Sequence, residues 1–501
     1  MVRRVRKGWG YMYLIKALVI LSMAFSLFFT ARAERPPLDA DRIAMIDQLV
    51  EERMAAMRIP GIALALIDNG EIVHIRGFGT TKRDGAPITE DTRFLIGSIS
   101  KPLFSLTLLD MVADGKLSLD DTIVQHIPSF QTRNATRSDT MTVRHLLSHR
   151  SGFSMLFGNR NHAANANGFE RMSTILDDAR RTSLRAQPGA QFEYSNANYQ
   201  LLGYLIEKIE GAPLEDVFAA RLTSKFGIEA TQLGLSPASD LSAVGHRYWL
   251  GTPRPHRWAP ERLHWAQGGV ESTVSDLASI LVRLMDELDP AASNPLWQSI
   301  LAAPPTVPEA SNYYGLGWFV RQSPAPIIAL HSGLNPGFEA LAGFSPDEKF
   351  GFVILANASS SYGARDLPSL HYGVYELLLG LPVRSMEISP QMRAVRITAL
   401  SLPVLILIWI ASFIWKLRRQ AFTPLSWQPV TIGWRVIGPT LLLAMVAYAL
   451  VFIAPALNNA SFVSVYVFQP DLGIALGLGA ALAGLWAIVR FGLRVSVANR
   501  S

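Results

Sequence analysis

The sequence of 501 residues contains no cysteine. Disulfide bonds, thiolate metal sites and a cysteine nucleophile are therefore excluded, and the fold must be stabilised by its core alone. Charged residues are also few, because Asp, Glu, Lys and Arg together make up 17% of the chain whereas hydrophobic residues make up 49%. This composition allows one large or two medium domains together with membrane segments.

Acidic residues are nearly absent from the two ends of the chain. Residues 1–33 and 397–501 contain 13 of the 46 Lys and Arg residues but only one acid, Asp471, which leaves 33 basic and 39 acidic residues for the middle. The middle therefore has a net charge of −6 and no electrostatic reason to bind nucleic acid. Basic residues that flank apolar runs are instead typical of membrane topology signals.

The first 33 residues predict a signal peptide. An apolar run at about 17–29 is followed by Ala31-Arg32-Ala33, whose small residues suit cleavage before Glu34. Arg3, Arg4, Arg6 and Lys7 precede this run. An uncleaved anchor helix is the alternative, and both interpretations place the middle of the chain outside the cytoplasm.

Three further apolar runs, each long enough to cross a bilayer, lie near the C-terminus at about 397–415, 436–457 and 472–489. Lys and Arg lie between the first two runs and after the third, whereas the loop 458–471 contains neither. The asymmetry predicts a multi-pass inner-membrane protein whose C-terminal tail is cytoplasmic. No run carries a central charge, so an ion or proton path is not expected.

The hydrophobic pattern between these ends predicts an α+β fold in an extracytoplasmic domain, residues 34–385, followed by a membrane domain, residues 386–501. Helical spacing at 38–59 precedes two strands, which Asn69-Gly70 joins as a hairpin. These two strands are expected at 62–67 and 72–78, and later strands at 314–320, 327–333, 338–344 and 350–356. A terminal helix is expected at about 367–379.

Ser98 stands three residues before Lys101 at the expected start of an apolar helix. Residues i and i+3 share one helical face, so the Lys101 ammonium can lie beside the Ser98 hydroxyl. The helix N-terminus also offers N–H groups and a positive dipole end to an oxyanion. Alone, however, Ser-x-x-Lys is more often a solvated helix start than a catalytic pair, so other motifs must decide.

The other candidate motifs are also weak when taken singly. Tyr194-Ser195-Asn196 precedes an expected helix, where a helix cap is favoured over a catalytic site when the motif is taken alone. His145 and His149, four apart on an expected helix, suggest zinc, but no glutamate stands at the metalloprotease position and no third ligand is evident. A role in hydrogen-bonding loops beneath the site is therefore favoured for both histidines.

Taken together, Ser98-Ile99-Ser100-Lys101, Tyr194-Ser195-Asn196 and His331-Ser332-Gly333 resemble the three active-site motifs of serine β-lactamases and penicillin-binding proteins in order and spacing. The Tyr-x-Asn motif and the leading histidine are similar to the class C β-lactamase-like group of D-amino-acid peptidases, DD-peptidases and esterases. The resemblance covers residues 36–380. It implies a β-lactamase/DD-peptidase-like fold, with an antiparallel sheet flanked by helices and a helical lobe, followed here by three transmembrane helices.

Chemistry gives the site residues their expected roles. Ser98 is the nucleophile, and Lys101 and Tyr194 share its proton, so either can be the formal base. Asn196 can hydrogen-bond Lys101 and a substrate amide, while the N–H groups of Ser98 and, by resemblance, Leu334 form the oxyanion hole. The remaining residues expected at the substrate-binding site are His264, His331, Ser332, Gly333 and Asn335. No metal and no organic cofactor is expected.

The order of signal, hydrolase domain and three spans is similar to the membrane-anchored peptidases that trim acylated D-asparagine leaders, the group of the colibactin-maturing peptidase. Leu95 departs from that group, in which an acidic residue is expected at this place. The predicted function is a membrane-anchored periplasmic serine hydrolase, a peptidase on D-amino-acid-containing or N-acylated peptides. The expected partners are a peptide or small-molecule substrate and the lipid bilayer, and the oligomeric state stays open. Alternatives are a β-lactamase or broad esterase, and a non-catalytic penicillin-binding-like sensor.

Overall fold

The computed structural model describes residues 35–160, 172–236, 241–289, 295–304, 312–322, 326–360, 367–383, 390–419 and 437–498. The expected signal peptide lies outside these residues. Residues 37–501 form one unit, which includes both the expected hydrolase domain and the C-terminal helices.

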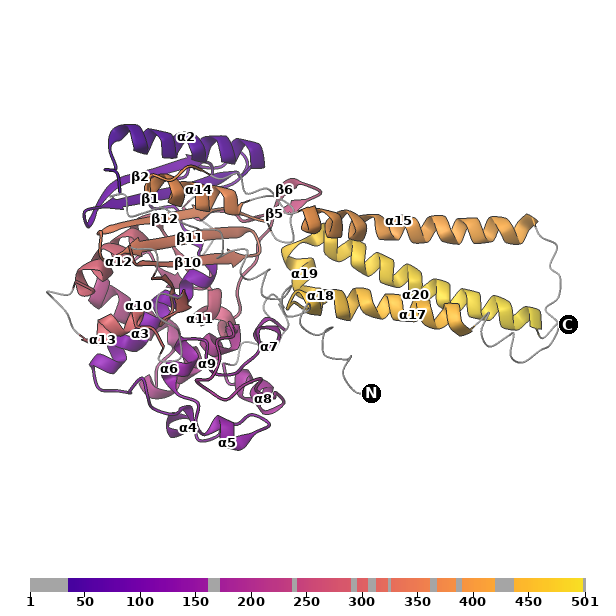
Figure 1. Ribbon diagram of the computed structural model, residues 1–501, viewed down its shortest axis with the longest axis horizontal. Coiled ribbons are helices and arrows are strands. Elements are labelled where there is room, and N and C mark those ends of the chain that lie inside the picture. Colours follow the sequence, from indigo (N-terminus) through magenta and orange to yellow (C-terminus); the bar gives the residue numbers. More distant parts are fainter. Residues whose placement is uncertain are drawn as a thin grey trace, which may run out of the picture. The chain divides into compact units, whose positions relative to one another are not determined.

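A seven-stranded antiparallel sheet, in the order β2-β1-β12-β11-β10-β9-β8, is the centre of the first part (Figure 1). Its strands are β1 (Gly61–Asp68), β2 (Glu71–Gly79), β8 (Tyr313–Tyr314), β9 (Phe319–Arg321), β10 (Ile328–Asn335), β11 (Phe338–Ser345) and β12 (Phe350–Ala356). The predicted hairpin is confirmed, because Asn69 and Gly70 both have positive φ, 52° and 79°, as a type I′ turn requires. The predicted meander is confirmed in β10, β11 and β12.

The strand predicted at 314–320 is wrong, because two short strands, β8 and β9, occupy this region. A tight turn separates them: Gly315 N–H donates to the Trp318 carbonyl at 2.8 Å, and Gly317 has a φ of 91°. Glycine tolerates this backbone conformation, which a strand does not contain. The turn reverses the chain so that β8 pairs with β9 at the edge of the sheet.

Helices cover both faces of the sheet, so β11 and β12 are buried along their whole length. The helices predicted at 38–59 and 367–379 are confirmed as α2 (Ala40–Met57) and α14 (Pro368–Leu378), which pack together on one face (Figure 1). α12 (Val274–Glu287) lies on the other face, against β1, β2, β11 and β12.

The remaining helices form a lobe around α3 (Ser100–Ala113), which is buried at every position from Ser100 to Leu109. The longer ones are α9 (Asn196–Glu210) and α10 (Leu214–Phe226). The shorter ones are α4 (Ile123–His126), α5 (Ala135–Ser138), α6 (Val143–Leu147), α7 (Met155–Asn159), α8 (Thr174–Arg180), α11 (Trp265–Gly268) and α13 (Pro295–Gln298). The 3-10 turns among the described residues of this part are η1 (Gly97–Ile99), η2 (Arg262–His264) and η3 (Ser299–Leu301).

Two small sheets complete this part. One contains β3 (Phe94–Leu95), β7 (Val270–Ser272) and β4 (Gln232–Leu233), and the other contains β13 (Ala358–Ser359), β5 (His246–Trp249) and β6 (Thr252–Pro255). β3 leads directly into the turn that carries Ser98. These elements give the α+β fold that the sequence predicts.

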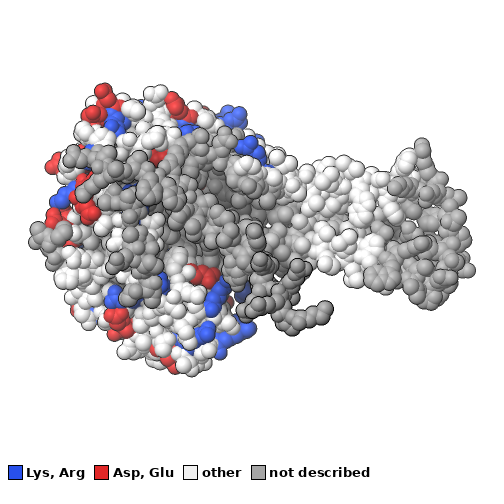
Figure 2. Space-filling view, in the orientation of Figure 1, with Lys and Arg blue, Asp and Glu red and all other residues white. Residues whose placement is uncertain are grey.

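The C-terminal part consists of apolar helices. They are α15 (Pro390–Arg419), α17 (Gly438–Tyr448), α18 (Ala454–Leu457), the short α19 (Phe462–Phe468) and α20 (Pro470–Ala498). A π-helical turn, η5 (Ala449–Ile453), joins α17 to α18. Three stretches, 396–415, 438–457 and 470–489, are long and apolar enough to cross a membrane, with mean hydropathies of 2.4, 2.3 and 2.2. On the face drawn in Figure 2, charged side chains of both signs lie on the larger, sheet-containing part, whereas the described surface that these helices show beyond it is white.

Candidate active site

Ser98 lies in η1, between β3 and α3, rather than in the first turn of an α-helix. β10 passes very close to this turn. A Cβ at Gly97 would stand 2.4 Å from the Leu334 main-chain nitrogen, and a Cβ at Gly333 would stand 1.9 Å from the Ile96 carbonyl oxygen. The two glycines therefore allow the serine turn and β10 to touch, which brings the first and third motifs together.

The predicted pairing of Ser98 with Lys101 is present in the structure. Lys101 Nζ donates to Ser98 Oγ at 3.0 Å and to the main-chain carbonyl of Gln267 at 2.5 Å. The lysine is fully buried, and this burial holds its pKa well below the ordinary value. A lysine held in this way gives up its proton readily and can act as a general base.

The Tyr194 hydroxyl forms a hydrogen bond with the same Ser98 hydroxyl, so the second motif also reaches Ser98. Burial raises the pKa of Tyr194, and the bond to Ser98 opposes this shift only in part. Both shifts favour the neutral amine and the neutral phenol. The structure therefore favours Lys101 as the proton acceptor, where the sequence left Lys101 and Tyr194 as equal candidates.

His149 holds the Tyr194 loop from behind. Its Nδ1 accepts from the Ser195 N–H at 3.1 Å and from Asn198 Nδ2 at 2.8 Å, while its ring packs on Tyr194 with centroids 4.1 Å apart. Asn198 Oδ1 in turn accepts from Ser151 at 2.6 Å. His149 is fully buried, and burial lowers its pKa well below 6.5. It is therefore a neutral structural support for the second motif.

The zinc interpretation, which the sequence disfavours, finds no support from the geometry of the two histidines either. α6 ends at Leu147, so His145 and His149 are not on one helix, and His149 has a φ of 55°. His145 accepts from the Thr142 N–H at 3.2 Å at the start of α6. Among the described residues, no group of His, Asp and Glu could hold a metal ion. The favoured role for both histidines, hydrogen bonding to the loops, is confirmed.

His331 lies on β10 with both ring nitrogens engaged. Nδ1 is 2.8 Å from the Ser332 carbonyl oxygen, which can only accept, so Nδ1 carries the proton and Nε2 accepts from the Tyr314 hydroxyl at 3.0 Å. Burial is the main cause that lowers the pKa of His331 to about 3. The third motif therefore presents a neutral imidazole.

The other predicted residues of β10 lie along the edge that faces the serine turn. β9 pairs with Ile328 to Leu330 only, so beyond Leu330 no described strand pairs with this edge. Ser332 is exposed there, and the Leu334 main-chain nitrogen adjoins Gly97. Asn335 is buried, and its Nδ2 donates to the Gly268 carbonyl at 2.8 Å. An extended substrate backbone fits an open strand edge of this kind.

Two predicted residues are placed by other contacts. The Asn196 side chain donates to Asn159 Oδ1 at 2.8 Å from the first position of α9. His264 is 2% exposed at the end of η2, and burial lowers its pKa to about 4. The expected roles of Asn196 and His264 in substrate binding stay predictions.

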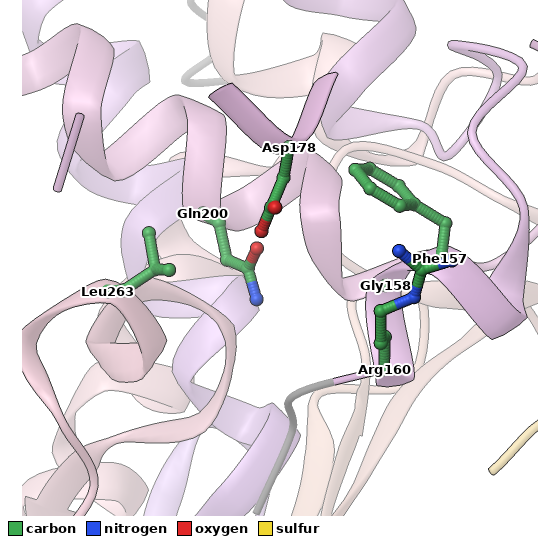
Figure 3. A pocket seen from close by; sticks show the side chains of 6 residues that line it. All are labelled: Phe157, Gly158, Arg160, Asp178, Gln200 and Leu263. Atoms are coloured by element: carbon green, nitrogen blue, oxygen red, sulfur yellow. The ribbon is translucent and has the colours of Figure 1, made fainter. Parts of the chain in front are cut away.

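A small cavity of about 10 Å³ lies between α7, α8, α9 and η2. Figure 3 shows the polar ends of Asp178 and Gln200 pointing toward each other in it. The volume suits about one water molecule and no substrate. Gln200 Nε2 donates to Gln267 Oε1 at 2.7 Å, so this wall also supports the residue whose carbonyl receives Lys101.

A family model described as Beta-lactamase matches residues 46–372. The chain belongs to the β-lactamase family. "Protein flp" of Staphylococcus aureus strain N315 is 24% identical over 462 residues, which cover 90% of each chain. "Unguisins hydrolase ungD'" of Aspergillus campestris is 26% identical over 385 residues, which cover 71% of this chain and 67% of the relative.

Two solved structures have a similar fold. The octameric penicillin-binding protein homologue from Pyrococcus abyssi gives a TM-score of 0.57 at 24% identity and covers 72% of this chain and 81% of its own. EstCE1, described as a hydrolase with promiscuous acyltransferase activity, gives a TM-score of 0.58 at 19% identity and covers 68% and 98%. The predicted β-lactamase and penicillin-binding-protein-like α+β fold is confirmed, and the family identifies the chain as a serine hydrolase.

Several residues of this β-lactamase-family site escaped the sequence analysis. Tyr314 and Phe319 wall Tyr194, with ring centroids 6.1 and 6.2 Å away, and Tyr199 lies 5.6 Å from Lys101 Nζ. Gln267 was missed as well, although it directly precedes the Gly268-Gly269 pair. No spacing along the chain relates Tyr314 and Phe319 to Tyr194, because only the pairing of β8, β9 and β10 brings them to the site.

Proposed function

We propose that this chain is a membrane-anchored extracytoplasmic serine hydrolase of the peptidase type, which acts on D-amino-acid-containing or N-acylated peptides through an acyl-enzyme. One observation carries the chemical part of the proposal. The Nζ atom of the fully buried Lys101, whose pKa burial lowers, lies 3.0 Å from the Ser98 Oγ, within reach of its proton, and Tyr194 bonds to the same hydroxyl. Such a serine is activated for nucleophilic attack.

The proposed reaction follows from these contacts. Ser98 Oγ attacks the substrate carbonyl while its proton passes to the neutral Lys101 amine. The main-chain N–H groups of Ser98 and Leu334 bind the oxyanion. They come from the two segments that meet at Gly97, the serine turn and β10. The C–N bond then breaks, and the leaving amine takes the proton from Lys101 through the Tyr194 hydroxyl. Water repeats the attack on the acyl-enzyme, which releases the acid and restores Ser98.

The substrate class is argued from His331. Its neutral imidazole supplies no fixed positive charge to attract the free carboxylate of a β-lactam. The edge of β10 beyond Leu330, with which no strand pairs among the described residues, suits a peptide whose scissile bond lies inside a longer chain. The relative named as a hydrolase of unguisins supports hydrolysis in general, and the similar fold of EstCE1, described as a hydrolase with promiscuous acyltransferase activity, keeps the ester alternative open.

Membrane anchoring is argued from the C-terminal helices. Three of them are long and apolar enough to span a bilayer, and the basic residues flank them with one consistent asymmetry. The alignment with protein flp covers 90% of this chain, so it reaches beyond the catalytic part into the C-terminal helices. This agreement in length supports an architecture in which catalytic part and helices belong together.

A fluorophosphonate probe on the purified full-length protein tests the proposal. Intact-protein mass spectrometry should show one adduct in wild type and none in Ser98→Ala. Ser118→Ala, which removes an exposed serine in the loop after α3, is the matched control and should still be labelled. Unchanged labelling of Ser98→Ala would show that the nucleophile is another residue. Labelling without turnover of any amide, ester or β-lactam would favour the non-catalytic sensor instead.

A further inference from the structure

Asn159, the last residue of α7, forms hydrogen bonds in two directions. Its Oδ1 accepts from Asn196 Nδ2 at 2.8 Å, and its Nδ2 donates to the main-chain carbonyl of Asn459 at 3.0 Å. Its own carbonyl oxygen accepts from the Ser464 hydroxyl at 3.3 Å. One residue therefore joins the second active-site motif to the segment 458–464, which follows α18 and enters α19.

The residues around Asn159 fix both sides of this link. A Cβ at Gly158 would stand only 2.4 Å from the Asn196 main-chain nitrogen, so α7 lies directly against the start of α9. On the other side Ser464 is 4% exposed, and its N–H donates to Ser461 Oγ at 3.1 Å. The segment 458–464 is thus held in place where it meets Asn159.

The direction of the hydrogen bonds fixes the orientation of both amides. A main-chain carbonyl can only accept, so Asn159 must turn its Nδ2 toward Asn459 and its Oδ1 toward Asn196. Asn196 must then turn its Nδ2 toward Asn159. In this orientation Oδ1 is the amide atom to which the proposed function assigns a hydrogen bond from Lys101 or from a substrate N–H. The carbonyl of Asn459 therefore sets the orientation of an amide that lies two hydrogen bonds away.

We propose that Asn159 is a positioning residue, which fixes the Asn196 amide for substrate binding, and that the segment 458–464 is a supporting part of the active-site wall. The inference rests on the proposed function, in which Asn196 binds the substrate amide. It assigns the C-terminal part of the chain a role in turnover as well as in anchoring.

Two substitutions in the full-length protein separate the two halves of the link. Asn159→Ala removes both side-chain hydrogen bonds, whereas Asn159→Asp keeps an acceptor for Asn196 and loses the donor to Asn459. We expect kcat/KM for an N-acyl-D-aminoacyl amide to fall about tenfold in Asn159→Ala and at least about threefold in Asn159→Asp, mainly through KM. Fluorophosphonate labelling of Ser98 should stay within about threefold of wild type, because this small probe does not use the Asn196 amide.

Arg247→Met is the matched control. Arg247 Nη1 donates to the Val467 carbonyl in α19 at 2.5 Å, a contact with the same C-terminal region that does not involve Asn159. This variant should keep the wild-type KM. Wild-type kcat/KM in both Asn159 variants would overturn the inference. So would a loss of kcat/KM in Arg247→Met as large as that in Asn159→Asp. A third contrary result is a folded Asn159→Ala protein in which Ser98 labelling falls as much as kcat/KM. Wild-type protein that neither becomes labelled nor turns over the amide overturns the proposed function itself.

Discussion

The main-chain carbonyl of Gln267 lies 2.5 Å from Nζ of Lys101. This carbonyl and the Ser98 hydroxyl together fix the position of the Lys101 amine. Burial lowers the pKa of Lys101, and no carboxylate among the described residues contributes to the shift. The amine is thus oriented by a main-chain group that substitution cannot remove. The position of Lys101 depends on α11 as much as on its own helix.

Replacement of Lys101 by Met or of Tyr194 by Phe should lower the rate of Ser98 acylation by a factor on the order of a hundred or more, as expected for lost general-base catalysis. Substrate binding should suffer less, because neither change removes the β10 edge. Stopped acylation reactions analysed by mass spectrometry measure the rate, and thermal unfolding verifies the fold. Near-normal acylation by folded Tyr194→Phe would remove Tyr194 from the mechanism.

His331 makes stability depend on pH in a defined direction. Its pKa is about 3 in the folded chain against 6.5 for an ordinary histidine, so between these values the unfolded state binds more protons. The contribution of His331 to the free energy of unfolding is complete above pH 6.5 and is lost as the pH falls toward 3. Between pH 6.5 and 4.5 the loss is about 2 kcal/mol for this residue.

Urea unfolding of wild type and His331→Gln at pH 7 and pH 4.5 measures this contribution. The variant should lose less stability on acidification than wild type does. His371→Gln in α14 is the matched control, because burial lowers the pKa of His371 to about 4 at a position outside the site. His371→Gln should reduce the loss of unfolding free energy between pH 7 and pH 4.5 by a similar amount but leave the hydrolysis rate unchanged. Equal losses in wild type and His331→Gln would show that His331 is not held neutral.

The regular parts of the fold could be predicted because their signals are local. Asn69-Gly70 specifies its hairpin turn through two positive φ angles, and the long apolar runs of the C-terminal helices need no tertiary context. The strand at 314–320 could not be predicted correctly. Its apolar pattern continues through Gly315 and Gly317, and only the hydrogen bond from Gly315 to Trp318 shows the reversal.

The site divides in the same way. Ser98 and Lys101 could be paired from a three-residue spacing, and the family motifs added Tyr194 and His331. The groups that orient Lys101 and His331 could not be found, because Gln267 acts through its main-chain carbonyl and Tyr314 reaches His331 through strand pairing. His149 was assigned to the loops beneath the site, but its packing on Tyr194 appears only in the folded chain.

The basic residues of the C-terminal part predict a membrane topology. Residues near Pro424 should be cytoplasmic and residues near Ser464 extracytoplasmic, because Lys and Arg concentrate around the former and are absent from the loop 458–471. Alkaline phosphatase fused after Ser464 should be active, and the fusion at Pro424 should be inactive. The reverse result would overturn the three-span topology and place α19, with Asn459 and Ser464, on the wrong side of the membrane for contact with Asn159.

The neutral His331 also predicts substrate preference. A site that lacks a fixed positive charge here gives up part of the attraction for a free carboxylate, although DD-peptidase-like enzymes with histidine at this position show that the residue does not forbid carboxylate recognition. We expect the specificity constant for N-acyl-D-aminoacyl amides or simple esters to exceed that for cephalosporins by at least about tenfold, roughly 1.4 kcal/mol of transition-state discrimination.

His331→Lys tests the cause of this preference. A lysine at this position places an ammonium beside the β10 edge. The variant should therefore reduce the ratio between the specificity constants for amides and for cephalosporins. Parallel assays with a chromogenic cephalosporin and a panel of D-aminoacyl amides and esters measure this ratio. His331→Gln, which stays neutral, is the control and should keep the gap. If the wild-type protein hydrolyses the cephalosporin efficiently and does not turn over the amides and esters, the peptidase assignment is wrong and a β-lactamase assignment replaces it. The neutral histidine would then not limit binding of the carboxylate.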